Sequence, residues 1–241
     1  MWKNPDWDSI NKEYIIPTLI KEKGIIPSLT SDELKNVYED KYILDAGCGP
    51  GHITQALLDK FNMKEYIGID TSEHAISFAK ENNKHPHCKY FIGDSINLNF
   101  KSESFDTVLS VNVIPTIDSK EKLKNLLSEC HRVLRSNGTL IIVSTYSEEL
   151  LSNKSSKNFQ AEIIDRSIIP IKCKLKVRKT DNSNVEFFDL CWPSEIIKLE
   201  IENAGFDIIR TVDISDQAHE NYKPFILFQC NKTRLNFSKI E

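Results

Sequence analysis

The sequence predicts an α/β protein whose mostly parallel sheet is covered by helices on both faces. From residue 41 to residue 146, short apolar runs alternate with amphipathic segments of roughly ten to twenty residues, the pattern typical of βαβ units. The 241 residues are 40% hydrophobic and 27% charged, which is ordinary for a globular chain with a sizeable core. No apolar run approaches the roughly 20 residues that a membrane span requires.

The elements follow one another in a regular order. Residues 1–40 combine helical spacing with prolines, and Thr30 or Ser31 begins a capping box, so we expect a short helical cap. Apolar runs then predict strands at 42–47, 66–70, 89–94, 105–114 and 139–146. Amphipathic segments between them predict helices at 51–61, 72–83 and 119–138.

The pattern changes after residue 146. Residues 172–180 and 184–192 alternate apolar and polar side chains around the turn-forming "DNSN", which indicates a β-hairpin inserted over one end of the sheet. A helix at 193–206 and strands at 207–214 and 224–232 restore the earlier alternation. We therefore expect a single domain, with a cap at 1–40, a ligand-binding core at 41–147, an insertion at 148–192 and the rest of the core at 193–234.

Charge and cysteine content narrow the classes of function. The 31 basic and 35 acidic residues leave a net charge of -4, so we expect no general attraction to nucleic acid or anionic lipid. The amino terminus has no apolar signal core, and the six cysteines form no CxxC pair. These features favour a cytoplasmic protein with reduced thiols.

A glycine-rich loop, "ILDAGCGPG", joins the first predicted strand to its helix. Gly47, Gly49 and Gly51 leave room for a ligand against the backbone, although a tight turn without a ligand fits the same letters. The spacing is GxGxG and no GK[ST] follows, so a phosphate loop is not indicated. Asp45 precedes the glycines, and no Lys or Arg lies between Tyr42 and Leu58. This acidic loop favours a ligand with an ammonium and a sulfonium over a pyrophosphate.

Two further acids end neighbouring strands. Asp70 follows Gly51 by about 20 residues, the offset at which an acid accepts hydrogen bonds from ribose hydroxyls. Asp94 ends the third predicted strand. Because parallel strands present their carboxyl ends at one crevice, Asp45, Asp70 and Asp94 are expected to face the same ligand.

These motifs resemble the class I S-adenosylmethionine-dependent methyltransferases. "ILDAGCGPG", "YIGIDTS", "FIGDS" and "FDTVLSVNVI" are similar to that family's first four motifs, and "HRVLRSNGTLII" to a later turn and strand. The resemblance covers about residues 41–146, and "ENAGFDIIR" and "PFILF" match the family's last helix and closing hairpin. It implies a Rossmann-like sheet of seven strands and S-adenosyl-L-methionine as cofactor, leaving S-adenosyl-L-homocysteine as product.

The resemblance also implies roles for residues at matching positions. Asp45 and the loop of Gly47, Cys48, Gly49 and Gly51 would line the methionine part. Asp70 and Thr71 would hold the ribose, and Asp94 would accept a hydrogen bond from the adenine amino group, with Ser95 and Ile96 beside the ring. Asn112 and Val113 would close the pocket near the sulfonium. Tyr14 is the candidate for an aromatic cover over the cofactor, unless it packs on the core.

The catalytic base is where the sequence departs from its relatives. Many of them carry a histidine where this chain has Thr116, and the Asn/Asp-Pro-Pro-aromatic motif of nitrogen methylation is missing. Candidates elsewhere are His52, His131 and Tyr146, although His52 also fits a polar helix start and His131 a packing role. "HPHC" at 85–88 holds potential metal ligands, but without a second ligand pair we expect no metal site.

Substrate choice is expected to rest on the cap and the insertion. Their aromatic residues either enclose the substrate or form the seam between cap and core: Trp2, Trp7, Phe187, Phe188 and Trp192. Lysines and an arginine in alternate positions of 172–178 either solvate an edge strand or meet an acidic substrate or an RNA backbone. We expect methyl transfer to an oxygen or nitrogen of a small molecule, by a monomer or homodimer, with no nucleic-acid or membrane partner. The alternatives are an RNA or protein methyltransferase and a non-catalytic cofactor-binding subunit.

Overall fold

A computed structural model describes residue 8 and residues 25–145, 159–165, 167, 169–178, 184–214 and 225–233. Its centre is a seven-stranded sheet in the order β3-β2-β1-β4-β5-β10-β9. The strands are β1 (Tyr42–Ala46), β2 (Glu65–Asp70), β3 (Cys88–Ile92), β4 (Phe105–Val111), β5 (Leu134–Thr145), β9 (Phe206–Asp213) and β10 (Phe225–Lys232). The first five are parallel, and β10 runs antiparallel to both β5 and β9. The predicted α/β fold with its seven-stranded, mostly parallel sheet is confirmed.

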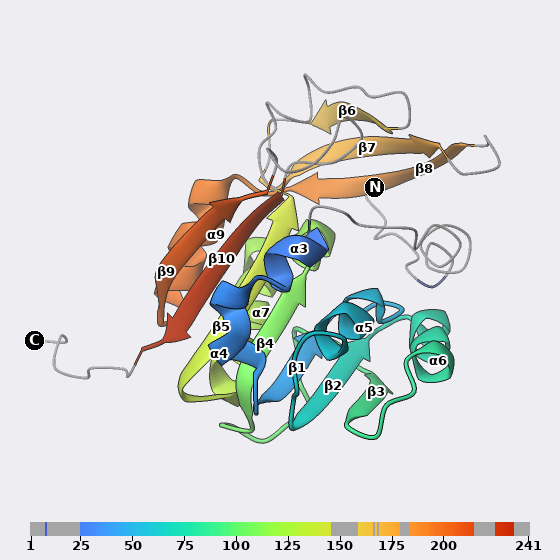
Figure 1. The fold of residues 1–241 in the computed structure, drawn as a ribbon. Helices are drawn as coiled ribbons and strands as arrows, with labels where there is room; N and C mark the ends of the chain where they lie inside the picture. The colour runs from blue at the N-terminus through green and yellow to red at the C-terminus, as the bar shows by residue number, and fades with distance from the viewer. Residues whose placement is uncertain are drawn as a thin grey trace, which may run out of the picture.

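Helices cover both faces of this sheet (Figure 1). On one side lie α3 (Ile25–Leu29), the 3-10 helix η2 (Asp32–Leu34), α4 (Lys35–Tyr38), α5 (His52–Leu58) and α6 (Glu73–Asn82). On the other lie α7 (Lys120–Val133) and α9 (Ser194–Asn203), with η3 (Ile114–Thr116) after β4. Apolar residues of each helix layer and of the sheet form two buried clusters, one per face. The sheet is therefore buried on both sides, as its continuous apolar runs predict.

Local boundaries differ from the sequence prediction at two helix ends. Ser31 caps η2 by accepting from the Glu33 amide, whereas the Thr30 hydroxyl donates back to Ile26, so no reciprocal capping box forms. The helix predicted at 119–138 ends at Val133, because Leu134 already pairs with Phe105 as the first residue of β5. Pairing with β4 thus replaces the last five residues of the predicted helix with the start of a strand.

The insertion is a three-stranded antiparallel sheet: β6 (Phe159–Asp165), β7 (Ile171–Arg178) and β8 (Asn184–Cys191). The predicted hairpin is β7–β8, and β6 is an element that the sequence prediction missed. This sheet lies beyond the carboxyl end of β5 and the amino end of β10 (Figure 1), and β8 packs against η3. No helix in the described part of the chain is long and apolar enough to cross a membrane. No disulfide joins the cysteines, all six of which lie in the described ranges.

Candidate functional site

The candidate site lies at the carboxyl ends of the parallel strands, where the strand order changes direction. β1 lies between β2 and β4. The chain goes from β1 to β2 and β3 on one side, and β4 and the later strands lie on the other side. Open α/β sheets bind ligands at this point, because the loops on either side separate there and leave a crevice. The glycine loop, residues 47–51, leaves β1 at this point.

Each of the first two loop glycines has its own reason to lack a side chain. Both have positive φ, at 99° for Gly47 and 52° for Gly49. A Cβ on Gly47 would lie 2.3 Å from Cγ2 of Val113, so the loop can press against the segment after β4 only with glycine there. A Cβ on Gly49 would meet no atom within 4 Å. Gly49 is therefore the loop position with open space before it, as close approach of a ligand requires.

Cys48 packs into the sheet. Its side chain is buried, and Gly68 of β2 lacks the Cβ that would lie 2.8 Å from its Sγ. The Cys48 amide donates to Ile69, as does the Gly47 amide. Cys48 thus anchors the loop to β2 by its thiol and amide, and Gly68 is a partner that sequence reasoning did not single out.

Asp70 joins the glycine loop to the start of α6. Its Oδ2 accepts from the Gly49 amide and its Oδ1 from the Ser72 amide, both at 2.9 Å. Burial raises the pKa of Asp70, while the backbone hydrogen bonds of Ser72, Gly49 and Thr71 act in the opposite direction. The predicted ribose acid therefore lies directly beside the predicted methionine loop and is held there by backbone donors.

Asp45 belongs to a buried polar group. Its side chain is 1% exposed, and its Oδ2 accepts a 2.5 Å hydrogen bond from the Tyr66 hydroxyl, which in turn accepts one from Thr54 at 2.9 Å. Burial raises the pKa of Asp45 to about 6; the Tyr66 hydrogen bond and the charge of His52 lower it, and Asp70 raises it further. The other oxygen, Oδ1, is buried and has no hydrogen-bond partner among the described residues. A carboxylate oxygen left in this way suits a cationic ligand group.

Asp94 lies just beyond the end of β3. Its Oδ1 accepts from the Ile96 amide at 3.0 Å and its carbonyl accepts from the Asn97 amide at 3.1 Å, which closes a tight turn around Ser95. Gly93 donates to the carbonyl of Asp70, so this turn is joined to the ribose acid through the backbone. The Asp94 side chain is exposed, and Ile96 packs against the core.

The segment after β4 closes the site on its other side. Asn112 has a left-handed backbone with φ of 59°, which ends the strand earlier than predicted. Its amide donates to Val143 of β5, and its side-chain Oδ1 is buried without a hydrogen-bond partner in the described structure. The Thr116 hydroxyl donates to the carbonyl of Val113 at 2.7 Å. The position at which relatives carry histidine is therefore engaged in holding the turn.

The catalytic candidates are separated by the fold. His52 begins α5 close enough to Asp45 for their charges to interact. His131 lies near the end of α7. Its ring packs edge-to-face on Phe206, with 5.2 Å between the ring centroids, and lies near Lys232, at the end of the sheet opposite the crevice. His131 is therefore a packing residue, because α7 runs antiparallel to the strands and carries it away from the crevice. Tyr146 and the predicted cover residue Tyr14 lie outside the described residues.

The remaining sequence candidates have structural explanations where they are described. In the described ranges, no three His, Cys, Asp or Glu side chains gather as metal ligands, and His85 and His87 lie ring to ring at 5.5 Å. Trp192 is fully buried and donates to the Ile117 carbonyl at 3.0 Å, so it belongs to the core on the α7–α9 face, away from the cap helices. Trp2 and Trp7 are outside the described residues, as are the side chains of Phe187 and Phe188.

The lysines of β7 face acidic neighbours. Lys174 forms a 2.7 Å ion pair with Glu186 of β8, which together with the charge of Glu162 of β6 raises its pKa. Hydrogen bonds from Ser167 are the main cause of a lowered pKa at Asp165 of β6, and the charge of nearby Lys172 lowers it further. These two lysines are thus balanced within their own sheet and do not form a free basic surface.

Comparison with known proteins places the site in a family context. Residues 44–142 match the family model described as "Methyltransferase domain". The phthiotriol/phenolphthiotriol dimycocerosates methyltransferase of Mycobacterium tuberculosis (strain ATCC 25177 / H37Ra) is 32% identical over 98 residues, 41% of this chain and 35% of that protein. The ajmaline N-methyltransferase of Rauvolfia serpentina is 28% identical over 130 residues, 52% of this chain and 43% of that protein. The chain thus spans well under half the length of these curated relatives.

Solved structures extend the similarity over nearly the whole chain. The PH0226 protein of Pyrococcus horikoshii OT3 matches with a TM-score of 0.71 at 20% identity, covering 93% of this chain and 99% of that one. An S-adenosylmethionine-dependent methyltransferase of Clostridium acetobutylicum ATCC 824 matches with a TM-score of 0.64 at 18% identity, covering 95% and 98%. At these identities the likeness is one of fold.

Proposed function

Because its core belongs to the class I S-adenosylmethionine-dependent methyltransferase family, we propose that this protein transfers the methyl group of S-adenosylmethionine to an oxygen or nitrogen of a small molecule. The observation that carries the proposal is the buried, unpartnered Oδ1 of Asp45 beside a glycine loop with open space at Gly49. An anionic oxygen without a donor, next to a backbone that a ligand can approach, fits the ammonium of the methionine moiety.

The described residues supply a contact for each part of the cofactor. Asp45 would hold the ammonium and Asp70 the two ribose hydroxyls, with Thr71 beside them. Gly49 would admit the methionine chain against the backbone, since Asp70 already fixes its amide. Asp94 would accept from the adenine amino group by the oxygen that its own turn leaves open, with Ser95 and Ile96 flanking the ring. Gly47 and Cys48 shape this loop by their contacts with Val113 and β2.

Methyl transfer requires the protein mainly to orient the acceptor and to enclose the reacting groups. Bound S-adenosylmethionine supplies a methyl group already activated by its sulfonium, so the protein has to hold a nucleophile in line with it and exclude water. Asn112 would lie near the point where the acceptor meets the sulfonium, and its buried amide oxygen, which has no partner among the described residues, could then receive a hydrogen bond from an acceptor N–H or O–H. An amide does not take up a proton, so Asn112 orients the nucleophile and does not serve as a base. Unless another residue supplies a base, the acceptor would be an amine that releases its proton after methylation, or an oxygen that arrives ionised.

Several features support a small acceptor. The β6–β8 sheet lies over the carboxyl ends of the strands, and its described lysines are balanced by acids. The two curated relatives described above are named for a lipid and an alkaloid substrate, whereas a third, from Drosophila melanogaster, is named as a U6 snRNA methylphosphate capping enzyme. The net charge of -4 disfavours an RNA substrate. A non-catalytic subunit would share the cofactor contacts, so only transfer distinguishes it.

Titration and transfer test the proposal together. Isothermal titration with S-adenosylmethionine and S-adenosylhomocysteine should show micromolar binding, and Asp70→Ala should weaken it at least tenfold while unfolding remains cooperative. A labelled-methyl assay against fractionated extract of the source cells should then place label in small molecules. Label in RNA or protein would favour that alternative, and binding without transfer would favour a non-catalytic subunit. Unchanged affinity in Asp70→Ala would contradict the ribose assignment.

A further inference from the structure

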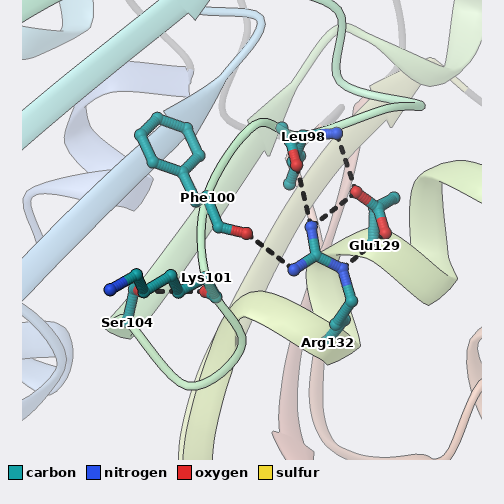
Figure 2. A network of polar contacts seen from close by, with 6 residues as sticks. All are labelled: Leu98, Phe100, Lys101, Ser104, Glu129 and Arg132. Atoms are coloured by element: carbon teal, nitrogen blue, oxygen red, sulfur yellow. Dashed lines mark hydrogen bonds and ion pairs between the residues drawn. The ribbon is translucent and has the colours of Figure 1, made fainter.

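A partly buried ion pair on α7 holds the loop that follows β3 (Figure 2). Arg132 donates to both carboxylate oxygens of Glu129, at 2.7 and 2.8 Å. The same guanidinium donates to the carbonyls of Phe100 at 2.7 Å and Leu98 at 2.8 Å. Glu129 completes the arrangement by accepting from the Leu98 amide at 2.7 Å. Two side chains one helical turn apart therefore satisfy three backbone groups of the loop.

These contacts begin at the residue that directly follows the Asp94 turn. The turn is closed internally by the Asn97 and Ile96 amides, and Leu98 follows it at once. Leu98 is the first loop residue with a fully engaged backbone and a buried side chain. The position of Asp94 is thus set from β3 on one side and from the Arg132–Glu129 pair, through Leu98, on the other.

Electrostatics make the pair a firm support. The hydrogen bonds of Arg132 are the main cause of a lowered pKa at Glu129, so the carboxylate stays ionised at neutral pH. Bidentate contacts between a guanidinium and a carboxylate are geometrically specific, and Arg132 lies in the last turn of α7, where a cation is favoured. A lysine could not donate to both loop carbonyls and the carboxylate in this planar arrangement.

We propose that Arg132 and Glu129 are positioning residues for the adenine end of the cofactor: they hold Leu98 and thereby the Asp94 carboxylate at the place where it reads the adenine amino group. This inference rests on the proposed function, because it takes Asp94 as the adenine acceptor. Neither side chain of the pair touches the ligand in this arrangement. The pair therefore acts on recognition of the base and leaves the methionine and ribose contacts unchanged.

The test compares two ligands that differ only at the adenine amino group. S-adenosylhomocysteine carries that group, and S-inosylhomocysteine has an oxo group in its place. The unaltered protein should bind the adenosyl compound roughly tenfold more tightly, the effect of one charge-assisted hydrogen bond. Arg132→Met should reduce this preference toward parity, by weakening the adenosyl compound and sparing the inosyl one. Hydrogen exchange at the Leu98 amide should speed up in the same variant.

Two further variants separate positioning from general stability. Arg135→Met removes another ion pair, to Asp106 at 2.9 Å, from a similarly exposed arginine that does not contact residues 94–101. It should keep the full adenine preference. Glu129→Gln keeps the shape of the Arg132–Glu129 pair. It should lose part of the adenine preference even if Arg132→Met does not fold.

The outcomes are distinct. An unchanged adenine preference in both Arg132→Met and Glu129→Gln would overturn the inference while leaving the proposed function in place. A wild-type protein that binds both compounds equally would also overturn it, because Asp94 would then not read the amino group. A wild-type protein that binds neither would overturn the proposed function itself.

Discussion

The hydroxyl of Tyr66 donates a 2.5 Å hydrogen bond to Asp45, 21 residues earlier in the chain and fully buried beside it. β1 and β2 pair in parallel with Asp45 opposite Gly68, which brings the tyrosine ring under the carboxylate. This bond opposes the effect of burial, which alone would keep the acid protonated over a wider pH range. The pair therefore sets the pH range in which Asp45 is anionic.

The first prediction concerns the pH dependence of cofactor affinity. With a pKa of about 6 for Asp45, affinity for S-adenosylhomocysteine should fall as the pH drops through 6, because a protonated acid no longer attracts the ammonium. Tyr66→Phe removes a hydrogen bond that lowers this pKa, so the midpoint should move up by about one pH unit. Titration calorimetry from pH 5 to pH 8 on both proteins measures the shift, and an equal midpoint would refute the role of Tyr66.

The stability of the ligand-free protein should change with pH in the direction opposite to cofactor affinity. Because the folded-state pKa of Asp45 lies above its unfolded value near 3.8, its contribution to stability is present below that value and is lost as the pH rises through about 6. Subtracting the unfolding curves of the Asp45→Asn protein isolates this contribution. The ligand and the fold therefore favour different protonation states of one residue.

The second prediction separates two glycines of one loop. Gly47→Ala should destabilise the fold by about 1–3 kcal/mol, because its Cβ would overlap Val113, and Val113→Ala should recover part of that loss. Gly49→Ala should cost only about 1 kcal/mol of backbone strain, yet weaken the cofactor at least tenfold by filling the open space. Chemical denaturation and calorimetry on the three variants measure both effects. Equal losses of stability at the two glycines would contradict this division.

The third prediction concerns Asp8, which binds residues at the start of α6. Its Oδ1 accepts from the Ser72 hydroxyl and the His74 amide, both at 2.9 Å, and its Oδ2 lies 2.5 Å from the His74 ring. The backbone hydrogen bond of His74 is the main cause of a lowered pKa at Asp8. Since the Ser72 amide also holds Asp70, this contact joins the amino-terminal segment to the cofactor site.

Removal of residues 1–20 should therefore abolish turnover and leave cooperative unfolding of the sheet. Asp8→Ala should have a smaller effect, raising KM for the cofactor a few-fold with little change in Tm. Steady-state kinetics and thermal unfolding on the two proteins test this, with Glu73→Ala as a control on the same helix turn. Full activity after the truncation would show that the segment does not choose the substrate.

The fold was largely readable from the sequence because its elements are encoded locally. Continuous apolar runs and amphipathic runs of period 3.6 depend only on neighbouring letters, so their alternation predicted every strand of the main sheet. β6 was missed, and Asn112 ended β4 early by a left-handed backbone that its letters do not show. The glycine loop and the acids at strand ends were visible for the same reason, since each lies at the junction of two local patterns.

What the sequence alone determined is thus the order of the elements and the acidic, glycine-rich crevice between them. The tertiary structure decided which distant side chains meet there. Strand pairing brought Tyr66 to Asp45, the packing of α7 brought Arg132 to Leu98, and the antiparallel course of that helix carried His131 away from the crevice. Such contacts join residues tens of positions apart, and no local periodicity records them, because they depend on how whole elements are stacked.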